Sequence, residues 1–149
     1  MNKLHFEVTI NAPKEKVWDT MIGAETYPQW TDIFMPGSNF QGSWEQGSKI
    51  IFTAPDENGK EGGMLARVAT SKPYEFISLE HYGQIVNGTE DTTSEDVKQW
   101  AGAHENYTFE EVGGGTKVTV DVDTPDEYKE EMEKIWPQAL DKLRVLAEV

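Results

Sequence analysis

Residues 124–148 read TPDEYKEEMEKIWPQALDKLRVLAE, and this stretch decides the fold. Thr124 and Glu127 have the spacing of a capping box, and Pro125 stands at the first helical position. The sequence therefore predicts a helix over about 125–148, on the order of 35 Å long at ~1.5 Å per residue, enough to cross a small sheet. Apolar residues recur along it at spacings of three and four, as on one face of a helix: Tyr128, Met132, Ile135, Trp136, Ala139, Leu140, Leu143 and Leu146.

Strands are predicted over much of the chain before this helix. Apolar and polar residues alternate there with a period of two, beginning with the strand 4–10. Turns at 56–60, where Asn58-Gly59 stands, and at 113–115 join later strands into antiparallel hairpins.

Two short helices are predicted after the first strand. Asn11 is the expected cap of the first, which ends at Gly23, and the second covers about 24–30. A further single turn of helix is expected after Thr93 or Ser94. These elements predict an α+β fold in one domain, 1–149: a curved antiparallel sheet of about seven strands wrapped around the long C-terminal helix.

Composition narrows the choice of partners. The chain has 149 residues, 13 Lys and Arg, 27 Asp and Glu, a net charge of −14 and no cysteine. Nucleic acid and anionic membranes are therefore not expected partners, and thiol chemistry is excluded. The N-terminus lacks the apolar core of a secretory signal, and membrane insertion is not expected, so we predict a cytoplasmic protein. We also expect a monomer.

Aromatic residues are concentrated in this hydrophilic chain, with 5 Trp, 5 Tyr and 6 Phe at a mean hydropathy of −0.62. Because one helix cannot cover about seven strands flatly, sheet curvature predicts a space between the helix and the inward strand residues. These side chains either fill that space as a core or line a usable cavity. The predicted ligand-binding residues are Trp30, Phe34, Met35, Trp44, Phe52, Met64, His81, Glu105, Tyr107, Phe109, Met132, Trp136 and Leu140.

Several short motifs, taken in order along the chain, resemble a known superfamily. They are Asn11-Ala12-Pro13-x-x-x-Val17-Trp18, Trp30, Pro36-Gly37-Ser38, Gly42-x-Trp44-x-x-Gly47, Gly114-Gly115-Thr116-x-Val118 and Trp136-Pro137-x-Ala139-Leu140-x-x-Leu143. Their order and spacing resemble the Hsp90-ATPase-activator-homologue branch of the START/Bet v 1-like (SRPBCC) superfamily. The resemblance implies a helix-grip fold around an apolar cavity. The superfamily spans lipid carriers, hormone and flavonoid binders, polyketide cyclases and aromatases, and a co-chaperone domain, so no settled activity is implied.

The candidates for chemistry are polar residues at strand positions that alternate with the outward-facing ones and so point into the sheet's inner face. Glu105 shares parity with Tyr107, whereas either His81 or Glu80 could face inward on the preceding predicted strand. An inward carboxylate beside an imidazole could transfer protons, or the pair could only orient a ligand. The three histidines lack metal-ligand spacing, so neither a metal nor a cofactor is expected.

Three functions follow as hypotheses. The first is a binding module for a small hydrophobic ligand: aromatic, lipid or polyketide-like. The second is a cyclase- or aromatase-like enzyme in which Glu105 acts with His81 or Glu80. The third, a role in chaperone activation, comes last, because 149 residues leave no room for the separate N-terminal domain that the eukaryotic activator also uses.

Overall fold

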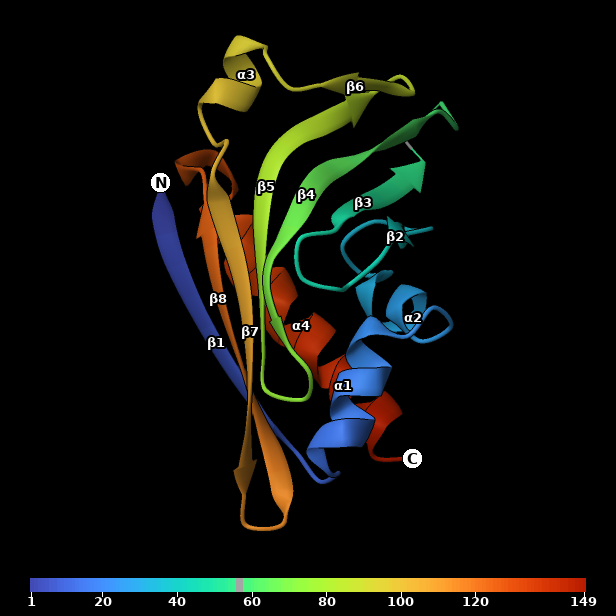
Figure 1. Ribbon diagram of the computed structural model, residues 1–149, viewed down its shortest axis with the longest axis vertical. Helices are drawn as coiled ribbons and strands as arrows, with labels where there is room; N and C mark the ends of the chain where they lie inside the picture. Colours follow the sequence, from blue (N-terminus) through green and yellow to red (C-terminus); the bar gives the residue numbers. More distant parts are fainter. Residues whose placement is uncertain (56–57) are drawn as a thin grey trace.

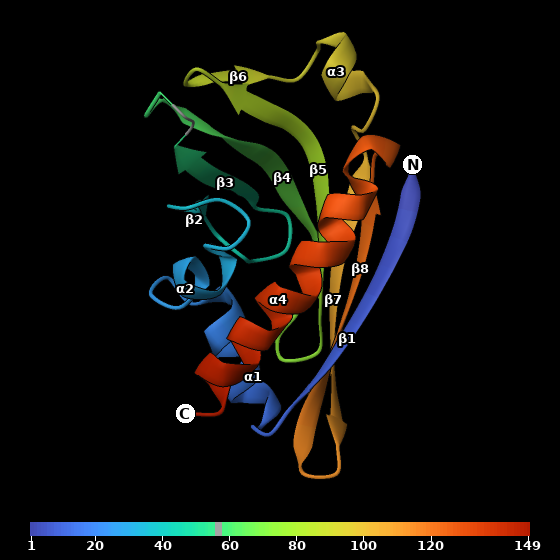
Figure 2. The same ribbon diagram turned by 180° about the vertical axis from the view of Figure 1, so that it is seen from behind.

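A curved antiparallel sheet forms one layer of the molecule, and the long C-terminal helix runs diagonally across one of its faces (Figures 1 and 2). The computed structural model describes residues 1–55 and 58–149. The strands are β1 (Asn2–Ile10), β2 (Asn39–Gly42), β3 (Lys49–Pro55), β4 (Glu61–Lys72), β5 (Phe76–Val86), β6 (Thr89–Asp91), β7 (Ala103–Val112) and β8 (Gly115–Thr124). The helices are α1 (Lys14–Ile22), α2 (Tyr27–Thr31), α3 (Glu95–Lys98), the 3₁₀ turn η1 (Asp126–Tyr128) and α4 (Lys129–Ala147).

The sheet order places the first and last strands of the chain beside each other. The strands follow β1-β8-β7-β5-β4-β3-β2, with the short β6 paired to β5. β4 has register shifts at Leu65/Ala66 and Val68/Thr70. Irregularities of this kind bend a strand and increase its twist, so they contribute to the curvature that lets the sheet wrap around a helix.

The long helix begins later than the capping box predicts. Thr124 is the last residue of β8 and pairs with Asn2, so it belongs to the sheet and makes no side-chain cap. The side-chain amide of Asn2 donates to Asp126, and one 3₁₀ turn leads into α4 at Lys129. Pairing within the sheet therefore prevails over the local capping signal.

The first helix also lacks its predicted cap. The Asn11 side chain does not cap α1; its backbone N–H instead donates to the Glu148 carboxylate at 2.9 Å, at the other end of the chain. The second helix occurs as α2, shifted towards the C-terminus. Ser94 does cap α3, accepting from the Val97 N–H.

The strand predictions hold with two differences. β5 continues to Val86, and the short β6 pairs with its end. The predicted turn at 56–60 includes residues 56 and 57, which lie outside the described residues.

The main core lies between the sheet and the helices α1, α2 and α4. The buried residues of α4 are Trp136, Ala139, Leu140, Leu143 and Ala147, all in its later turns. Towards its start Met132 is only half-buried and Tyr128 is 47% exposed. The helix is thus packed tightly at its C-terminal end and less tightly at its N-terminal end.

The C-terminal half of α4 should therefore carry most of its contribution to stability. Leu143 is fully buried, so we expect Leu143→Ala to lower the free energy of unfolding by about 2–5 kcal/mol. Val145 on the same helix is 51% exposed, and Val145→Ala should change it by less than about 0.5 kcal/mol. Urea unfolding followed by circular dichroism measures both, and equal losses would contradict this account of the core.

Candidate functional site

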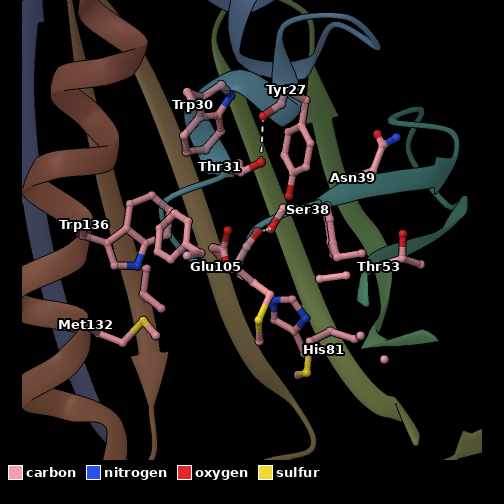
Figure 3. A pocket seen from close by; sticks show the side chains of 18 of the residues that line it. Tyr27, Trp30, Thr31, Ser38, Asn39, Thr53, His81, Glu105, Met132 and Trp136 are labelled. Carbon is pink, nitrogen blue, oxygen red and sulfur yellow. Dashed lines mark hydrogen bonds and ion pairs between the residues drawn. The ribbon is translucent and has the colours of Figure 1, made fainter. Parts of the chain in front are cut away.

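A pocket with a volume of about 360 Å³ lies where α4 is less tightly packed (Figure 3). It is bounded by the N-terminal part of α4, by α2 and the segment after it, and by strands β2, β3, β4, β5, β7 and β8. Met35, at its edge, is 48% exposed, so the pocket opens to solvent. The lining residues are Tyr27, Trp30, Thr31, Phe34, Met35, Ser38, Asn39, Phe52, Thr53, Ala54, Pro55, Gly62, Gly63, Met64, His81, Glu105, Tyr107, Val122, Met132 and Trp136.

The Trp136 indole is the centre of the aromatic wall. Its ring centroid lies 4.9 Å from that of Phe34 in an edge-to-face contact, 6.2 Å from Trp30 and 6.3 Å from Tyr107. On its other side it stacks with Phe6 of β1 at 6.1 Å. These contacts join α4 to α2 and to strands β1 and β7 of the sheet, and aromatic pairs of this geometry add to the energy of simple burial.

A second group of rings closes the opposite side of the pocket. Tyr27 lies 5.6 Å from Trp30 edge-to-face and 6.0 Å from Phe52, which in turn lies 6.1 Å from the His81 ring. Rings therefore line the pocket both from the helices and from β3. Flat apolar molecules match such walls in both area and geometry.

A polar cluster lies within this apolar surface. The Tyr107 hydroxyl donates a hydrogen bond to Glu105, and His81 Nε2 lies 3.4 Å from Glu105 Oε1. The side chains of His81 and Glu105 are only 12% and 20% exposed. Figure 3 shows Glu105 and His81 inside the space between Trp136 and Tyr27.

Strand register resolves which residue of β5 faces the pocket. His81 lines it, whereas Glu80 accepts a hydrogen bond at 2.7 Å from Arg67 of β4, on the other face of the sheet. Of the two alternatives that the sequence left open, His81 is thus the neighbour of Glu105. The inward orientation predicted for Glu105 is confirmed by its place in the lining.

The field of Glu105 reaches across the pocket. Burial, and after it the negative charge of Glu105, raise the pKa of the Tyr27 hydroxyl well above its ordinary value. Tyr27 therefore remains protonated and offers a hydroxyl to the pocket. Tyr27 was not among the predicted site residues, because only the packing of α2 directs its hydroxyl into the pocket.

Ten predicted site residues line the pocket, and three do not. The ten are Trp30, Phe34, Met35, Phe52, Met64, His81, Glu105, Tyr107, Met132 and Trp136.

Trp44, Phe109 and Leu140 are corrections, because all three are buried in the core. Trp44 packs behind the wall against Tyr27 and Phe52, and Phe109 packs against Trp18 of α1 at 5.3 Å. Leu140 lies one turn after Trp136, where α4 is tightly packed, and borders a second pocket, of about 350 Å³, beside β1.

The rim formed by β3 and β4 was missed because it is made of small residues. Ala54 pairs with Gly62, and a Cβ at Gly63 would lie 1.9 Å from the Phe52 carbonyl oxygen. Glycine at 63 is thus required by the close approach of the two strands. Ala54 has the parity of Phe52, a signal in the sequence that could have placed it in the lining.

Across residues 1–55 and 58–149, no group of three or more His, Asp or Glu side chains is placed to hold a metal ion. No helix of these same residues is long and apolar enough to cross a bilayer.

The fold and the sequence together identify the family. The sequence profile described as "Activator of Hsp90 ATPase homolog 1-like protein" matches residues 11–148. The chain belongs to this family. The predicted helix-grip fold and the predicted branch of the superfamily are both confirmed. A comparison with curated proteins finds no match.

Solved structures share the fold of this family member at low sequence identity. The Aha1 dimer from Colwellia psychrerythraea is 18% identical, with a TM-score of 0.70 over 100% of this chain and 98% of that one. ChR145 from Cytophaga hutchinsonii is 16% identical, with a TM-score of 0.73 over 99% and 94% of the two chains. DynU16, from the dynemicin biosynthetic locus, is 14% identical, with a TM-score of 0.73 over 100% of this chain and 48% of its own. These likenesses establish the fold alone.

The buried Tyr27 hydroxyl predicts a pH dependence of stability. A raised pKa in the folded state means that Tyr27 stabilises the fold fully below about pH 10, where the unfolded tyrosine is protonated. That contribution is lost as the pH rises, because only the unfolded state then releases the proton. Urea unfolding at pH 8 and about pH 10.5 should show a smaller loss for Tyr27→Phe than for the wild type.

The matched control removes an exposed hydroxyl instead. Tyr74 is 40% exposed, and Tyr74→Phe should retain the wild-type loss of stability with pH. Identical pH slopes for the wild type and Tyr27→Phe would contradict the burial of this hydroxyl.

Proposed function

We propose that the protein binds a small hydrophobic ligand, with a flat or aromatic body, in the pocket between α4 and the sheet. The observation that carries this proposal is an open pocket of about 360 Å³ walled by rings and containing one polar cluster. Its volume lies at the lower end of the ~300–1,000 Å³ typical of small-molecule sites. The family is consistent with the proposal, which comes from the geometry of this chain.

Affinity and orientation would come from different parts of the lining. Apolar burial contributes ~25 cal/mol per Å² and sets no direction, so the rings would supply most of the binding energy. The polar cluster of His81, Glu105 and Tyr107 lies among them and would fix one end of the ligand. The protein's expected monomeric state and cytoplasmic location remain predictions beside this one.

Filling the pocket should abolish binding without unfolding the protein. Ala54 lines the pocket on the same strand face as Phe52, so Ala54→Leu would add a branched side chain to the cavity. We expect the affinity for N-phenyl-1-naphthylamine, a neutral aromatic probe that fluoresces in apolar surroundings, to fall at least about tenfold, or ~1.4 kcal/mol. Fluorescence titration measures this change.

A second alanine provides the control. Ala101 is exposed in the turn before β7, so Ala101→Leu should bind the probe as the wild type does. Circular dichroism should confirm that both variants are folded. Equal binding by the wild type and a folded Ala54→Leu variant would contradict the proposed site.

An acid–base enzyme is the second candidate, and the contact between His81 and Glu105 favours it. The two groups face each other inside the pocket with no apolar residue between them, 3.4 Å apart. A carboxylate and an imidazole at this distance could remove and return a proton during ring closure of a polyketide-like substrate. This is the cyclase-like alternative, with His81 rather than Glu80 as the partner.

Product formation distinguishes the two candidates. A stabilised poly-β-ketone mimic incubated with the protein should yield a cyclised product by mass spectrometry if the pair is catalytic. Glu105→Gln and His81→Gln should each then reduce the rate at least about a hundredfold, the lower bound for general acid–base catalysis. Equal rates for the wild type and the double variant would exclude this candidate and leave the binding proposal standing.

A further inference from the structure

Glu105 is an acidic side chain without a cationic residue beside it in the pocket. The lining residues of the described chain include neither Lys nor Arg, and Glu105 is their one carboxylate. On the other face of the sheet Arg67 is paired with Glu80 at 2.7 Å, and the His104 ring lies 3.7 Å from the same carboxylate. The carboxylate charge is thus compensated within the pocket only by what His81 and Tyr107 supply.

His81 faces Glu105 through one ring nitrogen. Its Nε2 faces Glu105, whereas its Nδ1 is enclosed and has no hydrogen-bond partner among residues 1–55 and 58–149. A proton on Nδ1 would be a buried donor without an acceptor, which is costly. The arrangement therefore favours the tautomer that carries its proton on Nε2, where it points at Glu105.

The negative charge acts within the aromatic surroundings already described. After burial, the charge of Glu105 also contributes to the raised pKa of the Tyr27 hydroxyl on α2. Trp136, Trp30 and Phe34 line the same pocket, and the Trp136 ring contacts the rings of the other two. Both a carboxylate and aromatic faces attract a cation, while the same carboxylate repels an anion most strongly where water is scarce.

We infer that the pocket selects protonated amines carried on a flat apolar body, with the ammonium at Glu105 and the body between the rings, and that it rejects the matching carboxylates. This inference rests on the proposed function and narrows its ligand class. It separates an amine from a fatty acid or another acyl anion, which have equally apolar bodies. The charge of −14 on the whole chain acts in the same direction over longer distances.

A series of three compounds with one ring system tests the head group alone. The compounds are 2-(1-naphthyl)ethylamine, 2-(1-naphthyl)ethanol and 1-naphthylacetic acid, titrated calorimetrically at neutral pH and low salt. We expect the amine to bind at least about tenfold more tightly than the acid, with the alcohol between them, because hydrogen bonds to charged groups contribute more than neutral ones. Equal or tighter binding of the acid to the wild-type protein would overturn the inference, and this result needs no variant.

Two variants locate the source of the preference. Glu105→Gln should reduce the ratio of amine to acid affinity to within about threefold. Glu80→Gln removes a carboxylate one residue from His81, but on the other face of the sheet, and should retain the wild-type ratio. An unchanged ratio in a folded Glu105→Gln variant would overturn the role assigned to Glu105.

The alcohol separates failure of the inference from failure of the proposed function. If the alcohol binds but the amine gains nothing over the acid, the pocket binds ligands and the head-group preference is wrong. If none of the three compounds binds, the proposed binding function fails, and the inference fails with it.

Discussion

The packing of one indole determines how α4 meets the rest of the molecule. Trp136 contacts Phe6 of β1, Tyr107 of β7, Trp30 of α2 and Phe34 of the segment after α2. C-terminal to this ring, the helix packs tightly against the rest of the core through alanine and leucine side chains. Before it the helix meets the curved sheet less closely, and the pocket occupies that space. Core and pocket are therefore two consequences of the same contact.

The distribution of polarity follows from the alternation of strand residues. On β5, Glu80 points to the outer face and meets Arg67, while its neighbour His81 points inward to Glu105. Adjacent residues thus belong to a solvated ion pair and to an enclosed polar cluster. Surface pairs contribute little to stability, whereas an enclosed carboxylate among rings has strong effects on whatever enters. Carboxylates are thus present both on the surface of this acidic chain and, as Glu105, in its pocket.

Much of the fold could be predicted from periodicity, because strand alternation and helix spacing report directly which face is buried. The same parity placed Glu105 inward. It could not choose between His81 and Glu80, since that choice depends on register with β4 and β7. The capping box placed the start of the long helix too early, because Thr124 pairs in the sheet with Asn2, which is remote in sequence.

The candidate site was predicted less completely than the fold. Aromatic residues were predicted to bind the ligand, yet Trp44 and Phe109 fill the core. The rim depends on residues such as Gly62 and Gly63, whose importance comes from how closely two strands approach. Tyr27 contributes a hydroxyl that only the packing of α2 directs into the cavity. Such features follow from the tertiary arrangement and have no local pattern.

The indole N–H signals of the five tryptophans provide the most direct test of a ligand-binding pocket between α4 and the sheet. Proton–nitrogen NMR spectra recorded during titration with 2-(1-naphthyl)ethanol resolve each signal. Our account predicts shifts for Trp30 and Trp136, which line the pocket, and none for Trp18 and Trp100, which are buried elsewhere. An unchanged spectrum at saturating ligand, or shifts confined to Trp18 or Trp100, would contradict it.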